Sequence, residues 1–172
     1  MKLPVSKFLS IQNFITSDGS VIEDLCLAYQ TWGNLNYNMD NAILICHGYT
    51  NHHHALDKDI GWFNNLMGPH KAIDTNKYFV ICSNMLGSSF GTTGPKSIYK
   101  KTNKPYASNF PKITNLDIIN AIKLLLESFE IKKLHAALGY SFGGHLVYLW
   151  ATEFSNNLCK VISIAGSFDR WD

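Results

Sequence analysis

The sequence has 172 residues, of which 46% are apolar, 16% charged and 13% aromatic, with a formal net charge of +2. This length and composition predict one globular domain with one hydrophobic core. The absence of any block of five or six Lys or Arg residues disfavours nucleic acid as a partner. No apolar run approaches the roughly 18 residues of a membrane span, and the first residues, MKLPVSKFLSIQNF, lack the apolar core and cleavage site of a signal peptide. We therefore expect a cytoplasmic protein without membrane contact.

The first half of the chain predicts strands. Residues 8–33 contain two β-like stretches around Ser17-Asp18-Gly19-Ser20, which is typical of a hairpin. Two short apolar runs, NAILICHG at 41–48 and KYFVICSN at 77–84, predict strands that are buried on both faces. Residues 84–111 are rich in Gly, Ser, Pro and Asn. A loop of that length inside a domain is usually functional or covering.

The second half predicts helices that alternate with strands. Residues 113–131 have helical spacing of Ile and Leu, with Thr114 as the N-cap and Asp117 completing a capping-box-like pair. Strand, helix and strand then follow at 133–141, 142–154 and 159–167. This alternation favours an α/β fold with a mostly parallel sheet and helices on both faces. Because no helix follows the last strand, we expect the domain to be incomplete there.

The four cysteines are widely spaced, and no two of them form a C-x-x-C pair. Three of them lie in apolar runs, which favours buried, reduced thiols over disulfides or a zinc site. The four are Cys26, Cys46, Cys82 and Cys159.

Residues 139–143 read Gly-Tyr-Ser-Phe-Gly, a G-x-S-x-G pattern between the predicted strand and helix. A sharp turn at this point strains the serine backbone and raises its hydroxyl above the sheet, and glycine at 139 and 143 relieves crowding. The start of the helix points its free N–H groups and positive dipole end at an oxyanion. We therefore predict that Ser141 is a catalytic nucleophile. The alternative is a chance serine in a glycine-rich turn.

Acyl transfer also needs donors for the negative charge that develops on the substrate oxygen. In this arrangement they are the backbone N–H after the nucleophile and one from an earlier strand-end loop. We predict an oxyanion hole formed by the N–H groups of Phe142 and Tyr49. The alternative for His47-Gly48 is a simple turn that ends the strand.

Four stretches resemble the homoserine O-acetyltransferases and their succinyl-transferring and serine-acylating relatives, over most of the chain from about residue 25 to 165. They are YQTWGNLN…NAILICHGYT, GWFNNLMGPHKAIDTNKYFVICSNMLGSSFGTTGP, FPKITNLDIINAIKLLLESFEIKKLHAALGYSFGG and YLWATEF. The resemblance implies an α/β-hydrolase-fold acyltransferase that works by a ping-pong route. Its serine takes an acetyl or succinyl group from coenzyme A and passes it to an amino-acid hydroxyl in methionine or cysteine biosynthesis.

The resemblance also implies site residues, substrates and partners. Ser141 matches the nucleophile, Phe142 and Tyr49 match the oxyanion hole, and residues 83–95 match a segment near the active-site entrance. Acyl-coenzyme A is the co-substrate, homoserine or serine is the acceptor, and no bound cofactor or metal is expected. The complete protein is expected to form a homodimer, or to depend on a second chain for the missing half.

The chain departs from the family pattern at two motifs. It reads Gly-Tyr-Ser-Phe-Gly-Gly where family members often read Gly-Gly-Ser-Met-Gly-Gly, and His-Gly-Tyr-Thr where they often read His-Ala-Leu-Thr. The family's catalytic aspartate and histidine, its lid and its substrate-binding arginine lie in a C-terminal half. Residues 1–172 are thus expected to be the N-terminal part of a single α/β-hydrolase domain, without lid or C-terminal catalytic half.

None of the histidines in the chain is a convincing catalytic base. His145 is expected about one helical turn from the raised hydroxyl, and His47 is expected to shape the oxyanion loop. The run NHHHALD at 51–57 is expected to be a solvent-exposed loop near the site mouth rather than a metal site. The remaining histidines, His70 and His135, and the late acids, Asp169 and Asp172, gain no support from spacing.

Three alternatives to an acyltransferase remain open from the sequence. One is an esterase on the same scaffold, because the missing lid decides between water and an amino-acid hydroxyl as acceptor. Another is a non-catalytic remnant or binding module. The third is a split enzyme whose second chain supplies the aspartate and the histidine. In each case the isolated 172 residues are expected to show negligible acyltransferase turnover, because the triad base is missing.

Overall fold

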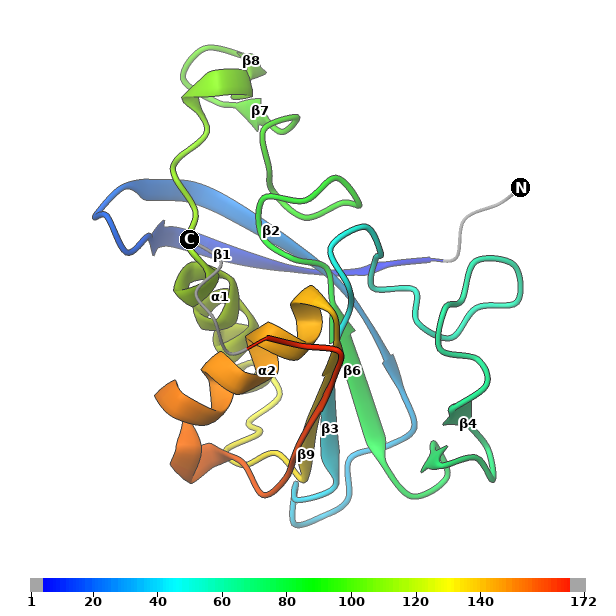
Figure 1. Ribbon diagram of the computed structural model, residues 1–172. Coiled ribbons are helices and arrows are strands. Elements are labelled where there is room, and N and C mark those ends of the chain that lie inside the picture. Colours follow the sequence, from blue (N-terminus) through cyan, green and yellow to red (C-terminus); the bar gives the residue numbers. More distant parts are fainter. Residues whose placement is uncertain (1–4, 168–172) are drawn as a thin grey trace.

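The computed structural model describes residues 5–167 and contains a six-stranded sheet in the order β1-β2-β6-β3-β9-β10 (Figure 1). Three neighbouring pairs are parallel, namely β6 with β3, β3 with β9 and β9 with β10, whereas β1 and β2 form the predicted antiparallel hairpin. A mostly parallel α/β sheet is therefore confirmed. Its strands are β1 (Lys7–Ile15), β2 (Val21–Trp32), β3 (Ala42–Cys46), β6 (Phe79–Ser83), β9 (Ala136–Tyr140) and β10 (Val161–Ile164).

Two helices accompany the sheet, α1 (Asn115–Glu127) and α2 (Phe142–Glu153). Residues 84–111, expected to be one long loop, contain a small hairpin and a 3₁₀ turn. The minor elements are β4 (Met67–Gly68), β5 (Ile73–Asp74), β7 (Ile98–Tyr99), β8 (Lys104–Pro105), η1 (Ala107–Asn109) and η2 (Ser155–Asn157). None of the helices within residues 5–167 is long and apolar enough to cross a membrane.

The start of α1 is fixed by the predicted capping box. The Asp117 N–H donates to Thr114 Oγ1, and the Asp117 carboxylate accepts from the Thr114 backbone N–H at 2.8 Å. The same buried carboxylate also accepts from the backbone N–H and the hydroxyl of Ser17, at 2.6 and 2.7 Å. Asp117 therefore joins the first turn of α1 to the β1–β2 hairpin turn.

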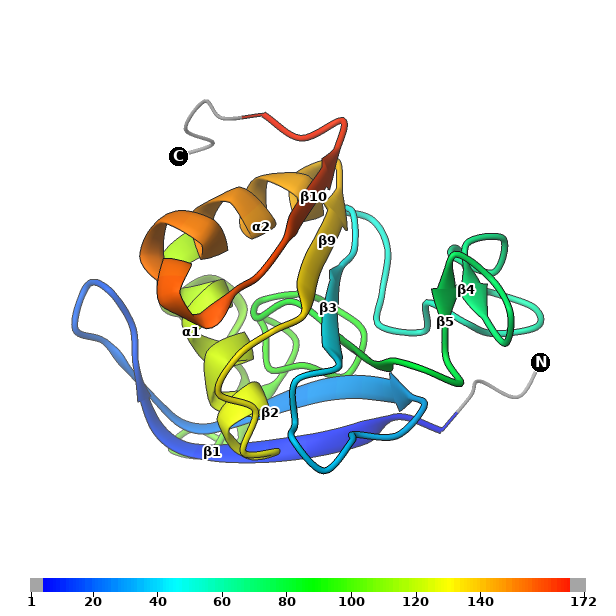
Figure 2. The same ribbon diagram turned by 90° about the horizontal axis from the view of Figure 1, so that it is seen from below.

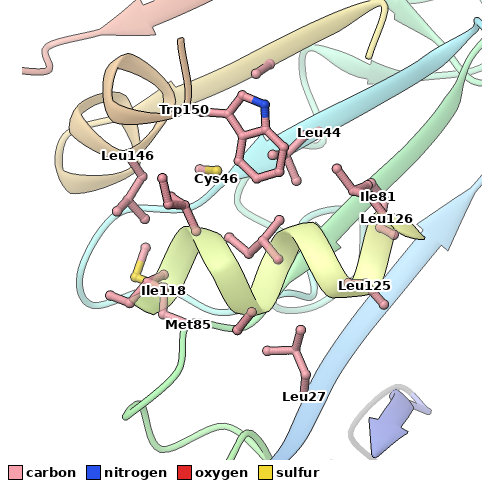
Figure 3. Close-up of a cluster of buried hydrophobic side chains, with 14 of the residues drawn as sticks. Leu27, Leu44, Cys46, Ile81, Met85, Ile118, Leu125, Leu126, Leu146 and Trp150 are labelled. Atoms are coloured by element: carbon pink, nitrogen blue, oxygen red, sulfur yellow. The ribbon is translucent and has the colours of Figure 1, made fainter. Parts of the chain in front are cut away.

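Both described helices pack on one face of the sheet (Figure 2). Side chains from the strands, such as Leu44 and Ile81, meet Leu125 of α1 and Leu146 of α2 in one apolar cluster (Figure 3). Each fully buried side chain of this size contributes roughly 1.5–3 kcal/mol to stability. This face holds the larger part of the hydrophobic core.

The opposite face of the sheet is covered differently from the prediction of helices on both faces. There Ile45 and Val80 pack against Phe63 and Met67, which belong to the connection between β3 and β6. In the described chain this connection contains only turns, bends and two-residue strands. The polar, turn-rich sequence before Phe63 thus folds as an irregular cover and not as a helix. Strands β3 and β6 are buried on both faces, as predicted.

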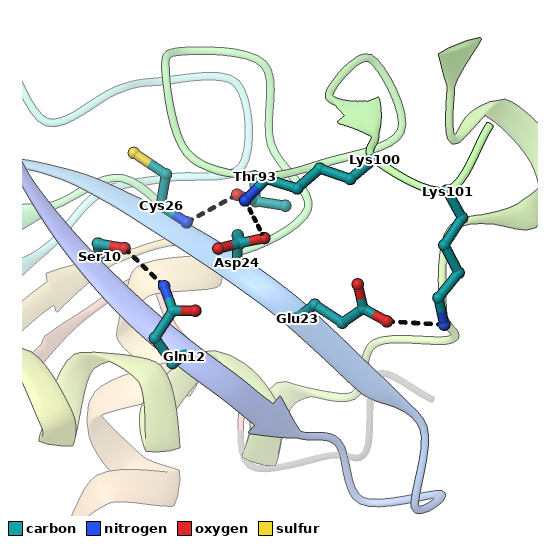
Figure 4. A network of polar contacts seen from close by, with 8 residues as sticks. All are labelled: Ser10, Gln12, Glu23, Asp24, Cys26, Thr93, Lys100 and Lys101. Carbon is teal, nitrogen blue, oxygen red and sulfur yellow. Dashed lines mark hydrogen bonds and ion pairs between the residues drawn. The ribbon is translucent and has the colours of Figure 1, made fainter. Parts of the chain in front are cut away.

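The segment after β6 runs alongside β2 and uses its backbone groups. The Cys26 N–H donates to Thr93 Oγ1 at 2.8 Å, and the Thr93 N–H donates back to the Cys26 carbonyl at 2.8 Å (Figure 4). Further along, Ala28 exchanges similar bonds with Thr92 Oγ1 and the Asn84 N–H. These bonds fix residues 84–93 against the sheet.

The β7–β8 hairpin is held to β2 by two ion pairs. Lys100 Nζ lies 2.6 Å from an oxygen of Asp24, and Lys101 Nζ lies 2.7 Å from an oxygen of Glu23 (Figure 4). The hydrogen bond from Lys100 lowers the pKa of the Asp24 carboxyl. Because these groups are exposed to water, each pair contributes little to stability.

All four cysteines are free, and three lie in strands, as expected. Cys46 and Cys82 are buried, Cys26 is half-buried, and Cys159 is exposed, so the prediction of burial is wrong for Cys159. Burial raises the pKa of the Cys46 thiol to about 12 and that of Cys82 well above its ordinary value. Both buried thiols therefore stay protonated and unreactive.

Candidate active site

Ser141 alone makes the turn between β9 and α2, since the strand ends at Tyr140 and the helix begins at Phe142. Its backbone angles are φ 52° and ψ −125°, a region that residues with a side chain rarely adopt. Holding a residue there costs about 1–3 kcal/mol and is typical of functional sites. The Ser141 N–H donates to the Ile164 carbonyl at 2.9 Å, whereas its exposed side chain makes no capping bond to the helix. This is the strained turn expected for a nucleophile, a role that stays a prediction.

Glycines 139 and 143 allow the turn to close. A Cβ at Gly139 would lie 2.1 Å from the Gly143 carbonyl oxygen, and a Cβ at Gly143 would lie 2.1 Å from the Cys46 carbonyl oxygen. Real Cβ atoms essentially never approach backbone atoms so closely. The predicted need for glycine at both positions is confirmed, and the close contact places the start of α2 against the end of β3 (Figure 1).

The structure brings the two predicted oxyanion-hole residues together. Phe142 is the first residue of α2, so its N–H has no acceptor within the helix. Tyr49 follows the end of β3, and its ring meets the Phe142 ring edge-on with centroids 5.7 Å apart. Among the described residues, the Tyr49 N–H donates to no other backbone group. Both amides are thus available near Ser141, and their binding of an oxyanion stays a prediction.

A pocket of about 520 Å³ opens beside these residues. Its lining combines Tyr49 and Phe142 with Phe90 and Phe110, and none of its lining residues is charged. Residues 85–90 form one wall, in agreement with the expectation that residues 83–95 lie near the site entrance. A second cavity, of about 740 Å³, is lined by residues that include Asp40 and Leu134. It therefore lies at the amino ends of β3 and β9, at the other end of the sheet from Ser141.

His47 lies buried at the start of the oxyanion loop, as expected, and the His145 ring contacts groups other than the Ser141 hydroxyl. His47 is fully buried, and its Nδ1–H donates to the Gly48 carbonyl at 2.8 Å. Burial lowers the pKa of His47 to about 4, so its ring is neutral at pH 7. His145 uses its ring nitrogens to contact Asn115 at 3.2 Å and the Ser167 carbonyl at 3.1 Å. Neither ring is a base for Ser141.

The run of three histidines is not a solvent-exposed loop, and that expectation is wrong. His53 and His54 are only 1% and 5% exposed, and their rings pack together with centroids 4.0 Å apart. Ser6, just before β1, contacts His53 Nε2 at 2.7 Å. Burial lowers the pKa of all three histidines of the run, that of His53 to about 3. Ser6 thus contacts this run from a distant part of the chain, which sequence patterns do not reveal.

The structure does not bring the other candidate catalytic bases and acids to the Ser141 site. His135 precedes β9 and contacts Lys160 Nζ, while His70 lies between β4 and β5. Asp169 and Asp172 lie outside the described residues. In the part of the chain that the structure describes, no histidine is hydrogen-bonded to the Ser141 side chain, and no group of three His, Cys, Asp or Glu residues could hold a metal ion.

Sequence reasoning missed three residues beside the site, namely Tyr140, Asn51 and Trp62. The Tyr140 hydroxyl accepts a hydrogen bond from Asn51 Nδ2, and the Trp62 ring packs on Tyr140 with centroids 5.2 Å apart. The sequence did contain a signal for Tyr140. The chain departs from the family motifs at Gly48 and at Tyr140, and in the structure these two residues lie in contact.

Comparison with known proteins finds relatives that share one name. Homoserine O-acetyltransferases from Methanosphaera stadtmanae and Pasteurella multocida are each 45% identical to this chain, over 152 and 157 residues. The matches cover 86% and 90% of this chain but only 31% and 44% of those proteins. The chain therefore spans less than half the length of these curated relatives.

Solved structures show the same pattern. The homoserine O-acetyltransferase from Bacillus anthracis has a TM-score of 0.89 at 35% identity, covering 96% of this chain and 47% of that one. Esterase E22 has a TM-score of 0.90 at 32% identity, covering 95% of this chain and 48% of that one. The family model for the alpha/beta hydrolase fold matches residues 41–172. The chain therefore belongs to the alpha/beta hydrolase fold family.

Proposed function

We propose that these residues form the nucleophile-bearing part of an acyltransferase of the homoserine O-acetyltransferase type. In the complete protein, an acetyl or succinyl group moves from coenzyme A to Ser141 and then to the hydroxyl of homoserine or serine. The strained Ser141 turn beside an uncharged aromatic pocket carries this proposal. Relatives of 45% identity that are named homoserine O-acetyltransferase support the choice of reaction.

The chemistry divides into two acyl transfers. Ser141 Oγ attacks the thioester carbonyl carbon while a base takes its proton, and the oxyanion that forms accepts hydrogen bonds from the Tyr49 and Phe142 N–H groups. The C–S bond then breaks, and coenzyme A leaves as the thiol with that proton. In the second transfer the acceptor oxygen attacks the acyl-serine carbonyl carbon while the base takes the acceptor's proton, and the bond from Ser141 Oγ to the acyl group then breaks as Ser141 Oγ takes up that proton. We place the base outside residues 5–167, since no described histidine ring is hydrogen-bonded to the Ser141 hydroxyl.

An esterase is the second candidate, and one observation favours it. Esterase E22 matches this chain as closely in fold as the B. anthracis transferase does, with TM-scores of 0.90 and 0.89. Both reactions use an acyl-serine and an oxyanion hole, and they differ only in whether water or an amino-acid hydroxyl accepts the acyl group. The measurement that separates them is whether acyl transfer depends on an added amino-acid acceptor.

The test uses the complete protein, in which the segment missing from this chain is present. Release of the coenzyme A thiol from acetyl- or succinyl-coenzyme A is followed with homoserine, with serine and without an acceptor. Hydrolysis of p-nitrophenyl acetate is measured in parallel. Ser141→Ala is compared with Ser10→Ala, which removes an exposed hydroxyl on β1.

We expect thiol release that depends on the acceptor, and a loss of about 10⁴-fold or more in Ser141→Ala. The Ser10→Ala control should match the wild type. Ester hydrolysis without acceptor-dependent thiol release would replace the transferase by the esterase. Unchanged activity in Ser141→Ala would overturn both readings. The 172 residues alone should show negligible turnover.

A further inference from the structure

The structure assigns to Tyr140 a role beyond its place next to the nucleophile. We propose that Tyr140 is a positioning residue that holds the oxyanion loop, defined here as residues 48–52, against the Ser141 turn. The proposal rests on the proposed function, because it concerns the placement of the Tyr49 N–H. It adds a residue that the G-x-S-x-G pattern leaves unspecified.

The first contact lies at the start of the oxyanion loop. A Cβ added to Gly48 would lie 2.8, 2.9 and 3.0 Å from the Cε2, Cζ and hydroxyl oxygen of Tyr140. The ring therefore lies directly on the Gly48 backbone, with no room for a side chain between them. The residue before Tyr49 is thus fixed by direct packing against the end of β9.

The second contact lies two residues after Tyr49. Asn51 Nδ2 donates a hydrogen bond to the Tyr140 hydroxyl, and the Asn51 backbone N–H donates to the Gly48 carbonyl at 3.0 Å. The second bond closes a turn over residues 48–51. Tyr140 therefore holds both ends of the turn whose interior contains Tyr49.

Trp62 adds a third contact to the same assembly. Its ring packs on the Tyr140 ring at 5.2 Å between centroids, and its Nε1–H donates to the His52 carbonyl at 2.8 Å. The indole thus backs the tyrosine ring on one side and holds the far end of the oxyanion loop on the other. This arrangement reduces the freedom of the Tyr140 ring to leave Gly48.

Tyr49 itself makes few contacts that fix its backbone. The residue is 77% exposed, its ring meets only the edge-on Phe142 ring among the described aromatic pairs, and in residues 5–167 its N–H has no backbone acceptor. The direction of that N–H must then come from its neighbours, which Tyr140 holds. Tyr140 and Ser141 are consecutive residues. The same short stretch of backbone therefore positions both the Tyr49 N–H, through the Tyr140 side chain, and the nucleophile. A donor prepositioned in this way stabilises the transition state more than the bound substrate.

The test compares Tyr140→Phe, Asn51→Ala and the double variant in the complete protein, with kcat and KM measured for acceptor-dependent thiol release. Tyr140→Phe keeps the ring that packs on Gly48 and removes only the hydroxyl. Tyr37→Phe is the matched control, because Tyr37 is fully exposed and lies far from Ser141, beside the cavity at the amino ends of the strands. Thermal unfolding of each variant checks that the fold is intact.

We expect each single variant to lower kcat about tenfold, the equivalent of one lost hydrogen bond, with KM changed less than twofold. The double variant should lose the same tenfold, because both changes remove one shared bond. Tyr37→Phe should equal the wild type. A hundredfold loss in the double variant, a change in KM alone, or wild-type kcat in Tyr140→Phe would each overturn the proposal.

The packing contact gives a second, independent test. Gly48→Ala alone should lower kcat, because its methyl group collides with the Tyr140 ring. Added to Tyr140→Gly, the same change should have no further effect, since the ring is gone; a further drop would contradict the packing argument. If Ser141→Ala retained full activity, the proposed function would fail first. Activity lost in Ser141→Ala but kept in Tyr140→Phe would reject the positioning role alone.

Discussion

Replacing Ser141 by glycine tests the backbone strain at the predicted nucleophile. The φ of 52° and ψ of −125° cost a residue with a side chain about 1–3 kcal/mol, and glycine removes most of that cost. Glycine also gives the unfolded chain more freedom, which lowers stability by roughly 0.5–1 kcal/mol. The net expectation is a gain of about 1 kcal/mol in the free energy of unfolding. Ser141→Ala keeps the Cβ and therefore the strain.

The assay is thermal and urea unfolding of wild type, Ser141→Gly and Ser141→Ala under identical conditions. For a chain of this size, about 1 kcal/mol corresponds to a rise in Tm of roughly 2–4 °C. Ser141→Gly should show this rise and Ser141→Ala little change in Tm, and in the complete protein both variants should lose acyl transfer. If Ser141→Gly were no more stable than Ser141→Ala, the strain at this turn would not have the energy assigned to it.

Two further predictions concern stability. Asp117→Ala removes the acceptor for Thr114 and Ser17, so we expect about 3 kcal/mol less stability in urea unfolding. Lys101→Ala, at an exposed ion pair, should lower the free energy of unfolding by under about 0.5 kcal/mol. Equal losses of stability in Asp117→Ala and Lys101→Ala would contradict the argument that burial makes the Asp117 bonds stronger. His47 has a folded-state pKa of about 4, against about 6.5 unfolded. The unfolded state therefore binds the proton first as the pH falls from 6.5 to 4, and His47 alone should lower the free energy of unfolding by about 3 kcal/mol across that window, with no effect above about pH 7. In His47→Gln this part of the pH slope should vanish, and an unchanged slope would assign it to other groups.

The sequence was informative where local chemistry decides the structure. The runs that became β3 and β6 are wholly apolar, because both faces of these strands are buried. The capping box at Thr114 is a local hydrogen-bond pattern, and it formed as predicted. The turn at Ser141 was also readable, because the flanking glycines are needed for contacts within and next to the motif.

The rest depended on contacts between distant residues. The buried His53 and His54 contact Ser6, which lies 47 and 48 positions away from them in the sequence. The Asn51–Tyr140 bond joins positions 89 apart in the sequence. The cover on the second face of the sheet has no helical periodicity, so its packing against Ile45 and Val80 could not be read from spacing.

Along the edge that does not pair with β1, strand β2 bonds to two segments, and this has a consequence for the pocket. Its last residues pair with β6, whereas Cys26 and Ala28 bond to residues 84–93, which include the pocket wall at 85–90. Swinging that wall outward would break the hydrogen bonds that join residues 84–93 to Cys26 and Ala28 of β2, so we expect the wall and β2 to open together. A change of ligand size on this side of the pocket must then come by replacing side chains such as Phe90, because the backbone that carries them is part of the scaffold.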